Sequence, residues 1–322
     1  MDVADLRVFE AVSRLGSMNR AAQELNTVQS NVTARIRALE EGLGVSLFQR
    51  HARGVTTTAA GQRLLPFAPR LASLLAEAAA AAKDDGTPGG LLQIGSLETT
   101  AALRLSPLLS RFARCHPQVR LVVTTGTTAR LLEDVLAFRV DGAFVAGPVA
   151  HPDLAQEKLF EEELVLVTAP SIVRLADLAA LPDIAIIVFQ LGCSYRQRLE
   201  SLLAAEGILH AKPLAFGSLD AILSCVGAGV GITLLPRGVA ARAADAGEVR
   251  LHRLPPQEAR AETLFIRRRD AYLSSAAKAF LAMARTPLPA ATGRDRPGLD
   301  DRLDGGRAAS GTAALPAGSE SH

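Results

Sequence analysis

The first forty-four residues carry apolar positions at helical spacing. One apolar stripe recurs every three residues and predicts an opening helix that ends near Gly16. This stripe comprises Leu6, Phe9, Val12 and Leu15. A second stripe has the spacing i, i+3, i+4 and i+7 and predicts a second, short helix. It comprises Met18, Ala21, Ala22 and Leu25. Its two alanines allow a neighbouring helix to come close.

A third helix is predicted after a tight joint. Asn26 is expected to end the second helix, and Thr27 to cap the third at its N-terminus. Its buried stripe is expected to be Val28, Val32, Ile36 and Leu39. The opposite face is polar and carries Gln29, Ser30, Thr33, Ala34 and Arg37, with Asn31 in the first turn. Two short helices with such an outward face predict a helix-turn-helix, which places its second helix in the major groove of DNA.

The next segment favours DNA binding over a small helical packing module with a solvated polar face. Residues 47–48 and 55–57 read as two short strands, and the turn 49–54 between them carries Arg50, His51 and Arg53. A basic hairpin in this position is a wing that can contact phosphates or the minor groove. Residues 1–60 contain seven Arg and six acidic residues, so affinity must depend on where the Arg lie and on dimer formation.

The chain resembles the LysR-type transcriptional regulators along its N-terminal signature. The matching residues are Phe9, Val12, Gly16, Ser17, Ala21, Ala22, Leu25, Gln29, Ser30, Val32, Thr33, Ile36, Leu39, Glu40, Leu43, Gly44, Leu47, Phe48, Arg50, Arg53, Thr57, Thr58, Ala60, Gly61, Leu64 and Leu65. Many members have Ser-Gln-Pro where this chain has Val28-Gln29-Ser30, and a basic residue where it has Ala34. The preferred operator bases therefore cannot be taken from a relative.

Together, the pattern and the resemblance assign a winged helix-turn-helix DNA-binding domain to residues 1–58. The candidate contacts to double-stranded DNA are Thr27, Gln29, Ser30, Asn31, Thr33, Arg35, Arg37, Arg50 and Arg53. Gln and Asn can bond an adenine edge through two atoms, and Ser can donate or accept a hydrogen bond.

Residues 59–90 are interpreted as a linker and dimerisation segment. An Ala/Leu-rich helix is expected over 58–83, with a kink at Pro66 or Pro69, and 83–90 is a flexible joint. Five leucines form an apolar side with little beneath it in one chain: Leu64, Leu65, Leu71, Leu74 and Leu75. This side covers either its own domain or a second copy. The resemblance favours a second copy, in a homodimer or homotetramer, and RNA polymerase is a further candidate partner.

From residue 91 the chain alternates strands and helices, which predicts a largely parallel α/β sheet covered by helices. Predicted strands occupy 91–96, 119–126, 141–147, 163–170, 184–189, 213–217, 230–236 and 262–270. The resemblance implies a two-lobed, type 2 periplasmic-binding-protein-like effector domain over 91–286. Lobe I is expected at 91–163 and 266–286, lobe II at 164–265, with crossings near 163–167 and 262–267. Pro, Gly, Ser, Asp and Arg dominate residues 287–322, which predicts a disordered tail.

A small-molecule effector is expected in the cleft between the lobes. Ligands of open parallel sheets bind at the carboxyl ends of strands, beside helix N-termini. Four segments, two from each lobe, supply the candidate effector-binding residues Ser96, Thr99, Thr100, Thr125, Thr127, Cys193, Ser194, Arg196, Phe216 and Ser218. Hydroxyls, N–H groups and one cation suit an anionic group such as a carboxylate. Taken singly, each Ser or Thr is more commonly an ordinary N-cap, and Arg196 suits a helix surface equally well.

Other chemistry is not indicated. GAGVG at 227–231 precedes a strand instead of opening a helix, so no dinucleotide site is expected. Cys115-His116 lacks a second pair at zinc spacing, and the scattered His give no nucleophile–base pair, so no metal, cofactor or catalytic residue is assigned. Cys193 and Cys225 could form a redox switch, although inert thiols are more common. No membrane span or signal peptide is expected, which indicates a cytoplasmic protein. The alternatives are a regulator with a vestigial cleft, and a cytoplasmic small-molecule-binding protein or enzyme without a DNA role.

Overall fold

The computed structural model describes residues 2–51, 54–174, 178, 185–189, 194–205, 207–208 and 212–286. The segment 287–322, for which the sequence predicts disorder, lies outside the described residues.

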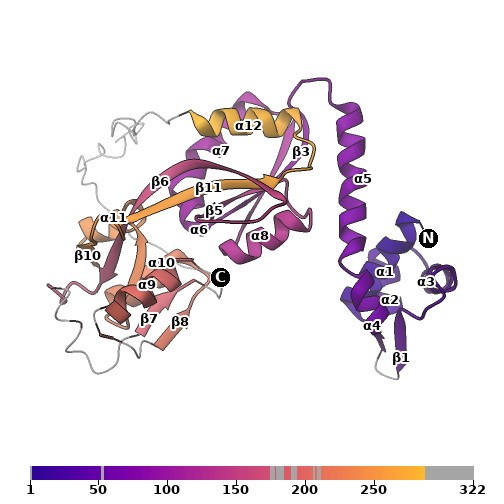
Figure 1. Ribbon diagram of the computed structural model, residues 1–322, viewed down its shortest axis with the longest axis horizontal. Coiled ribbons are helices and arrows are strands. Elements are labelled where there is room, and N and C mark those ends of the chain that lie inside the picture. Colours follow the sequence, from indigo (N-terminus) through magenta and orange to yellow (C-terminus); the bar gives the residue numbers. More distant parts are fainter. Residues whose placement is uncertain are drawn as a thin grey trace, which may run out of the picture. The chain divides into compact units, whose positions relative to one another are not determined.

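Three helices and a hairpin form the N-terminal domain (Figure 1). The elements are α1 (Val3–Leu15), α2 (Met18–Glu24), α3 (Gln29–Leu43), β1 (Phe48–His51) and β2 (Gly54–Thr57). A capping box formed by Asp2 and Asp5 begins α1, and Gly16 ends it in the left-handed conformation at φ 63°. The predicted apolar stripes meet in one core, in which Phe9, Val32 and Ile36 have no exposed surface.

The joint between α2 and α3 is built as predicted at Asn26 but differently at the two residues that follow. Asn26 has φ 51°, and the backbone N–H of Thr27 donates to the carbonyl of Ala22 at 2.9 Å, which closes α2 in a Schellman-type turn. The N-cap of α3 is Val28, not Thr27. Val28 is 65% exposed because it precedes the helix in an extended conformation, so its predicted burial is wrong.

The hairpin is tighter than predicted. β1 and β2 pair antiparallel from Phe48 opposite Thr57 to His51 opposite Gly54, so Gln49 to His51 belong to a strand instead of a turn. The backbone N–H groups of Leu47 and Phe48 both donate to Glu40 Oε1, at 2.6 and 3.1 Å. A single carboxylate therefore fixes the hairpin to α3. The predicted contact Arg53 lies outside the described residues.

The linker consists of two helices, α4 (Ala59–Leu64) and α5 (Phe67–Lys83). The interruption falls at Pro66, which has no N–H to donate to the preceding turn. Leu64 and Leu65 pack on the N-terminal core, contrary to prediction. Leu71, Leu74 and Leu75 are exposed, along with Phe67.

The helical stretch Ala59–Lys83 is also long and apolar enough, by length and composition alone, to cross a membrane. Of its most apolar 18-residue window, 6% is buried. A single such helix is weak evidence for a membrane span, and the sequence predicts none.

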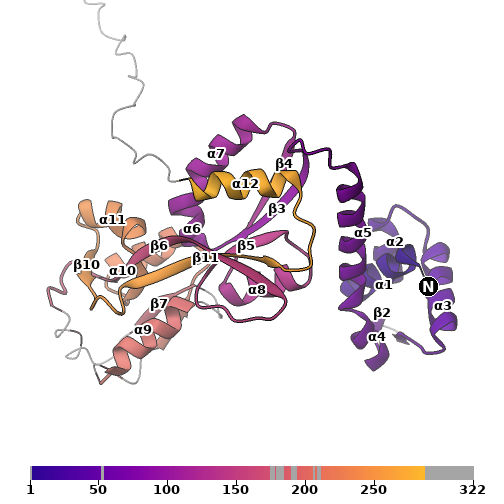
Figure 2. The ribbon, with the colours of Figure 1, turned by 45° about the horizontal axis from the view of Figure 1, so that its top comes forward.

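The first lobe of the C-terminal domain is a sheet with strand order β6-β11-β5-β3-β4 (Figure 2). These strands are β3 (Gly90–Ser96), β4 (Val119–Thr125), β5 (Gly142–Ala146), β6 (Leu154–Thr168) and β11 (Arg260–Arg268). β3 is parallel to β4 and β5, whereas β11 is antiparallel to β5 and β6. One face packs on α7 (Ser106–Cys115) and α12 (Ser275–Arg285), and the other packs on α8 (Thr128–Leu136).

The second lobe is built on the other half of β6. From Leu164 onward β6 pairs antiparallel with β9 (Thr233–Pro236) and β10 (Arg250–Arg253). β7 (Ala185–Val188) pairs in parallel with β8 (Lys212–Ala215) and reaches Ile232 through a single bridge. The helices α10 (Leu219–Gly227) and α11 (Arg237–Asp245) cover one face, and α9 (Ser194–Ala205) covers the other.

Both crossing strands are antiparallel, so the domain is a mixed rather than a largely parallel sheet. β6 changes partners between Glu163 and Leu164, at the predicted first crossing. β11 pairs with lobe I strands along its whole length from Arg260. The return to lobe I is therefore complete before the predicted second crossing at 262–267.

Candidate functional sites

The first turn of α3 presents a polar surface, as predicted. Gln29, Ser30 and Asn31 are exposed, and Arg37 is exposed two turns further on, while Thr33 is half-buried. Asn31 Nδ2 donates to Thr27 Oγ1 at 2.9 Å, so these two predicted contacts are engaged with each other. Gln29 and Ser30 have no side-chain hydrogen bond among the described residues. They are therefore the residues of this turn best placed to meet a base edge.

Arg35 is directed away from this surface, although the sequence analysis grouped it with the DNA contacts. Its Nη1 lies 2.9 Å from Asp5 Oδ1 and 3.7 Å from Asp2 Oδ1, at the start of α1. The pKa of Asp2 is lowered chiefly because the backbone N–H of Asp5 donates to its carboxylate, and the charge of Arg35 adds to this effect. Arg35 thus ties α3 to α1.

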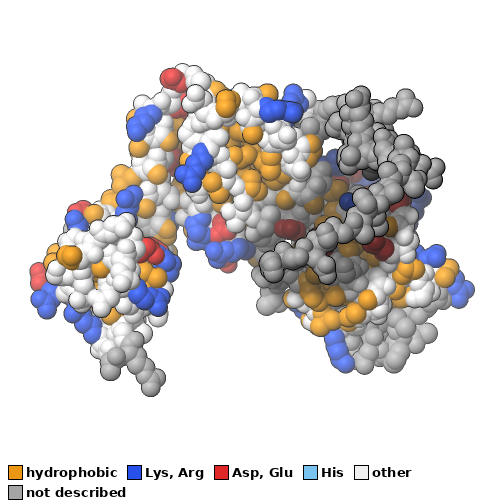
Figure 3. All heavy atoms as spheres, turned by 180° about the vertical axis from the view of Figure 1, so that it is seen from behind, with side chains coloured by type: hydrophobic (Ala, Val, Ile, Leu, Met, Phe, Trp, Pro, Cys, Tyr) orange, Lys and Arg blue, Asp and Glu red, His pale blue; other side chains and the backbone are white. Residues whose placement is uncertain are grey.

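The arginines of the N-terminal domain divide into a group with ion pairs and a group without them, and Figure 3 shows several Lys or Arg side chains on the surface of this domain. Arg14 pairs with Glu10 and Glu24, and Arg35 pairs with Asp5. Arg7, Arg20, Arg37 and Arg50 are exposed, without an ion pair among the described residues. Of the predicted basic contacts, Arg37 on α3 and Arg50 on β1 therefore remain available to phosphates.

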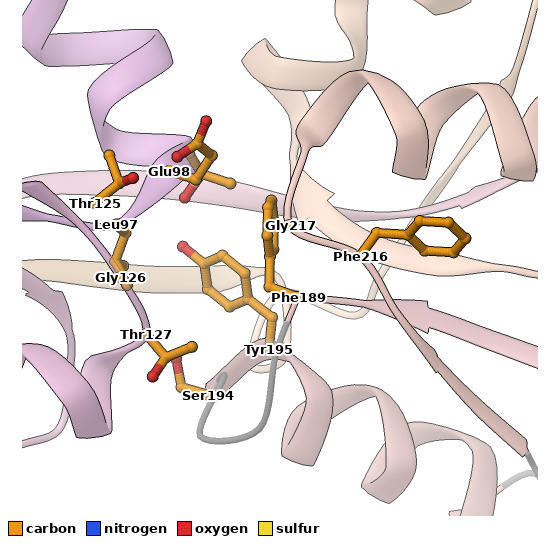
Figure 4. Close-up of a pocket in the computed structure, with 11 residues that line it drawn as sticks. Leu97, Glu98, Thr125, Gly126, Thr127, Phe189, Ser194, Tyr195, Phe216 and Gly217 are labelled. Atoms are coloured by element: carbon orange, nitrogen blue, oxygen red, sulfur yellow. The ribbon is translucent and has the colours of Figure 1, made fainter. Parts of the chain in front are cut away.

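A cavity of about 160 Å³ lies between the two lobes (Figure 4). Both lobes line it, as the sequence analysis expected. Its lining residues are Leu97, Glu98, Thr99, Thr125, Gly126 and Thr127 from lobe I, and Phe189, Ser194, Tyr195, Phe216 and Gly217 from lobe II. Strand ends and helix starts from both lobes thus converge on this cavity.

Five of the ten predicted effector contacts line this cavity. They are Thr99, Thr125, Thr127, Ser194 and Phe216. In Figure 4 the ring of Phe216 points away from the cavity, so this residue lines the cavity with its backbone and not with its ring. Thr127 is the N-cap of α8, and its Oγ1 accepts a hydrogen bond from the Arg130 N–H at 3.3 Å, which leaves its own O–H to donate.

The other predicted contacts lie elsewhere. Ser96 is fully buried, and its hydroxyl donates to the carbonyl of Leu97 at 2.9 Å. Thr100 is buried in α6 (Glu98–Thr100), and Ser218 is exposed at the start of α10. Arg196 donates from Nε to Glu200 Oε1 at 2.8 Å, one turn along α9, and does not line the cavity. Cys193 lies outside the described residues.

Three lining residues, Glu98, Phe189 and Tyr195, were not among the predicted effector contacts. Tyr195 is buried, with its hydroxyl directed toward the lobe I side of the cavity in Figure 4. Phe189 stands beside it. Glu98 directly follows Leu97 at the start of α6. Tyr195 lies within the segment 192–196 that the strand-end rule selected, although it was not chosen as a contact. Phe189 and Glu98 border selected residues, and the rule could have found them had it been applied to whole loops.

The remaining candidate chemistry is limited. Cys225 is half-buried against the core of lobe II, and Cys115 is exposed. Within the part of the chain that the structure describes, no three His, Cys, Asp or Glu are grouped so that they could hold a metal ion.

Comparisons with known proteins agree with both parts of this architecture. The family model for the LysR substrate binding domain matches residues 85–288, and that for the bacterial regulatory helix-turn-helix protein of the lysR family matches residues 3–62. The HTH-type transcriptional regulator GltR of Bacillus subtilis (strain 168) is 42% identical over 285 residues, which are 88% of this chain and 96% of GltR. The HTH-type transcriptional regulator CzcR of Bacillus anthracis is 38% identical over 281 residues, which are 87% of this chain and 96% of CzcR.

Solved structures show the same arrangement. Full-length CbnR in complex with its target DNA has a TM-score of 0.64 and 25% identity, covering 88% of this chain and 99% of CbnR. A full-length OxyR variant from Pseudomonas aeruginosa, at 18% identity and a TM-score of 0.60, covers 88% of this chain and 93% of its own and shares the fold.

Fold, sites and comparisons define a DNA-binding transcriptional regulator with a separate effector-binding domain, rather than an enzyme. The chain belongs to the LysR family.

Proposed function

We propose that this regulator recognises its operator with the first turn of α3 and responds to a small effector in the interlobe cavity. The observation that carries the proposal is the combination of an exposed, uncommitted Gln29-Ser30 pair with a cavity lined from both lobes. As a bacterial regulator of transcription, it would act in the cytoplasm.

The DNA contacts divide by chemistry. Gln29 and Ser30 can bond base edges in the major groove, because both lie in the first turn of α3 and point off its buried stripe. Arg37 and Arg50 supply charge to phosphates. Arg35 positions α3 through its ion pair with Asp5 instead of contacting DNA.

The effector is proposed to carry an anionic group held by neutral donors. The hydroxyls of Thr127 and Ser194 lie near one another at the cavity in Figure 4, one on each lobe. Backbone N–H groups at the starts of α8 and α9 add positive potential. A ligand that contacts both lobes favours their approach, because it gains these contacts only in the closed form.

Two copies are required for two DNA half-sites. The exposed apolar residues of α5 provide the surface for pairing, and the exposed Leu91 and Val122 on the lobe I sheet offer a second surface for a tetramer.

Gel-shift titration with the DNA upstream of the protein's own gene tests the DNA-reading role. Gln29→Ala should cost about 1–3 kcal/mol of operator binding and little binding to random DNA. Gln62→Ala, at an exposed glutamine on α4, is the matched control and should bind as wild type. Equal losses on operator and random DNA for Gln29→Ala would refute base reading by this residue.

A further inference from the structure

Among the described residues that line the interlobe cavity, Glu98 alone has a charged side chain. Glu98 is half-buried at the start of α6. Its carboxylate has no hydrogen bond or ion pair with any residue that the structure describes. The cation that the sequence analysis placed here, Arg196, is paired with Glu200 on its own helix and does not line the cavity.

An effector with negative charge alone would meet this carboxylate without a counter-charge. Two like charges in a closing cavity repel each other, and the repulsion grows as water leaves. A protonated amine on the effector reverses the sign of this interaction and forms a charge-assisted hydrogen bond with Glu98.

The other walls of the cavity differ in chemistry. Thr127 and Ser194 offer hydroxyl donors at the starts of two helices of at least eight residues, which suits a carboxylate. Leu97, Phe189 and Tyr195 form apolar surface between these donors and Glu98 (Figure 4). One small molecule that satisfies all three walls has an amine and a carboxylate separated by an apolar skeleton.

We infer that the effector of this regulator is a small zwitterion, an amino acid whose ammonium and carboxylate groups lie at opposite ends of an apolar skeleton, and that Glu98 binds its ammonium group. This inference rests on the effector role of the cavity given above, and it replaces an anionic ligand with a zwitterionic one. Glu98 then sets specificity, because analogues that lack the amine leave its carboxylate unpaired.

The test is calorimetric titration of the full-length protein with four probes of increasing length: β-alanine, 4-aminobutanoate, 5-aminopentanoate and 6-aminohexanoate. Each has two matched analogues, the hydroxy acid of the same skeleton and the amine that lacks the carboxylate. At least one amino acid should bind about tenfold more tightly than either analogue. Glu98→Gln should reduce its affinity about tenfold, and it should tighten binding of the hydroxy acid because the repulsion from the carboxylate is removed. Glu98→Asp keeps the charge and should restore part of the preference.

Glu248→Gln, at an exposed glutamate after α11, is the matched control and should titrate as wild type. Thermal unfolding of each variant separates a lost contact from a lost fold. The inference is overturned if none of the four amino acids binds, if the hydroxy acids bind equally well, or if Glu98→Gln keeps the preference. Operator binding, measured separately by gel shift, decides the proposed DNA-binding function whatever the titrations show.

Discussion

Glu40 offers a direct test of how the wing is held to the recognition helix. It is half-buried near the end of α3, and one oxygen, Oε1, accepts both backbone N–H groups at the start of the hairpin. Leu47 and Phe48 are 1% and 7% exposed, so water cannot readily replace the carboxylate. Each N–H group left without an acceptor costs about 1–3 kcal/mol. Since relaxation recovers part of this, Glu40→Ala should destabilise the N-terminal domain by about 2–4 kcal/mol.

Glu40→Gln should have a smaller effect. Its amide oxygen can take the place of Oε1 and accept both bonds, so only the charge-assisted part is lost, at about 1 kcal/mol. Glu41→Ala is the matched control, because Glu41 is the exposed neighbour and its side chain has no bond among the described residues.

Hydrogen exchange of the full-length protein, followed by mass spectrometry, provides the assay. The chain has no Trp, and exchange resolves the N-terminal domain separately from the rest. Protection of the β1–β2 peptides should fall strongly in Glu40→Ala, slightly in Glu40→Gln and not in Glu41→Ala. Equal protection in Glu40→Ala and Glu41→Ala would show that the two hydrogen bonds do not hold the wing.

Two further predictions concern the linker. Replacing both Leu71 and Leu74 with glutamate should convert the oligomer into smaller species and abolish operator binding, as measured by light scattering and gel shift. The control Val230→Glu, at another exposed apolar site, should change neither. An unchanged mass for the double variant would exclude α5 from the interface. The carboxylate of Asp84 accepts hydrogen bonds from the first turn of α12. These bonds, chiefly the one from the Ser275 hydroxyl, hold the pKa of Asp84 far below its usual 3.8. Because the folded pKa is depressed, this anchor is complete above about pH 4 and is lost as the pH falls further. Asp84→Asn should therefore increase hydrogen exchange in the first turn of α12 at neutral pH and remove the acid sensitivity of that exchange. The control Asp85→Asn should do neither. Identical exchange in the two variants would show that Asp84 does not anchor α12.

Periodicity was sufficient for the N-terminal helices because their stripes face one small core. It failed at Val28, since a residue that precedes a helix does not follow the helical period. It also failed at Arg35, whose partner Asp5 lies thirty positions earlier in the chain. The sequence alone does not distinguish an unpaired surface arginine from one that forms an ion pair with a residue distant in the chain.

The α/β domain was predicted in order but not in detail. The strand-end rule selected loops from both lobes, and the cavity lies between them, because carboxyl strand ends converge in such sheets. The first half of β6, residues 154–163, was not predicted, since its charged side chains stand in consecutive runs and give no alternation of apolar and polar positions. Cross-strand ion pairs, such as Lys158 with Glu262 at 2.7 Å, compensate those charges only once β11 is in place. The helix α11 and the strand β10 were also missed.

The charge pattern of the N-terminal domain bears on why this protein would need two DNA-binding heads. Ion pairs engage Arg14 and Arg35, so the seven Arg against six acidic residues overstate the charge available to DNA. The exposed arginines of one head can neutralise only a few phosphates, and each phosphate contact adds about 0.9 to the salt slope of binding. One head should therefore bind weakly and with a shallow salt dependence. The proposed pairing of α5 would double the contacts, and it would make the distance between the two heads depend on lobe closure. On this reasoning, linker variants that block pairing should halve the salt slope on random DNA, while Gln29→Ala should leave that slope unchanged.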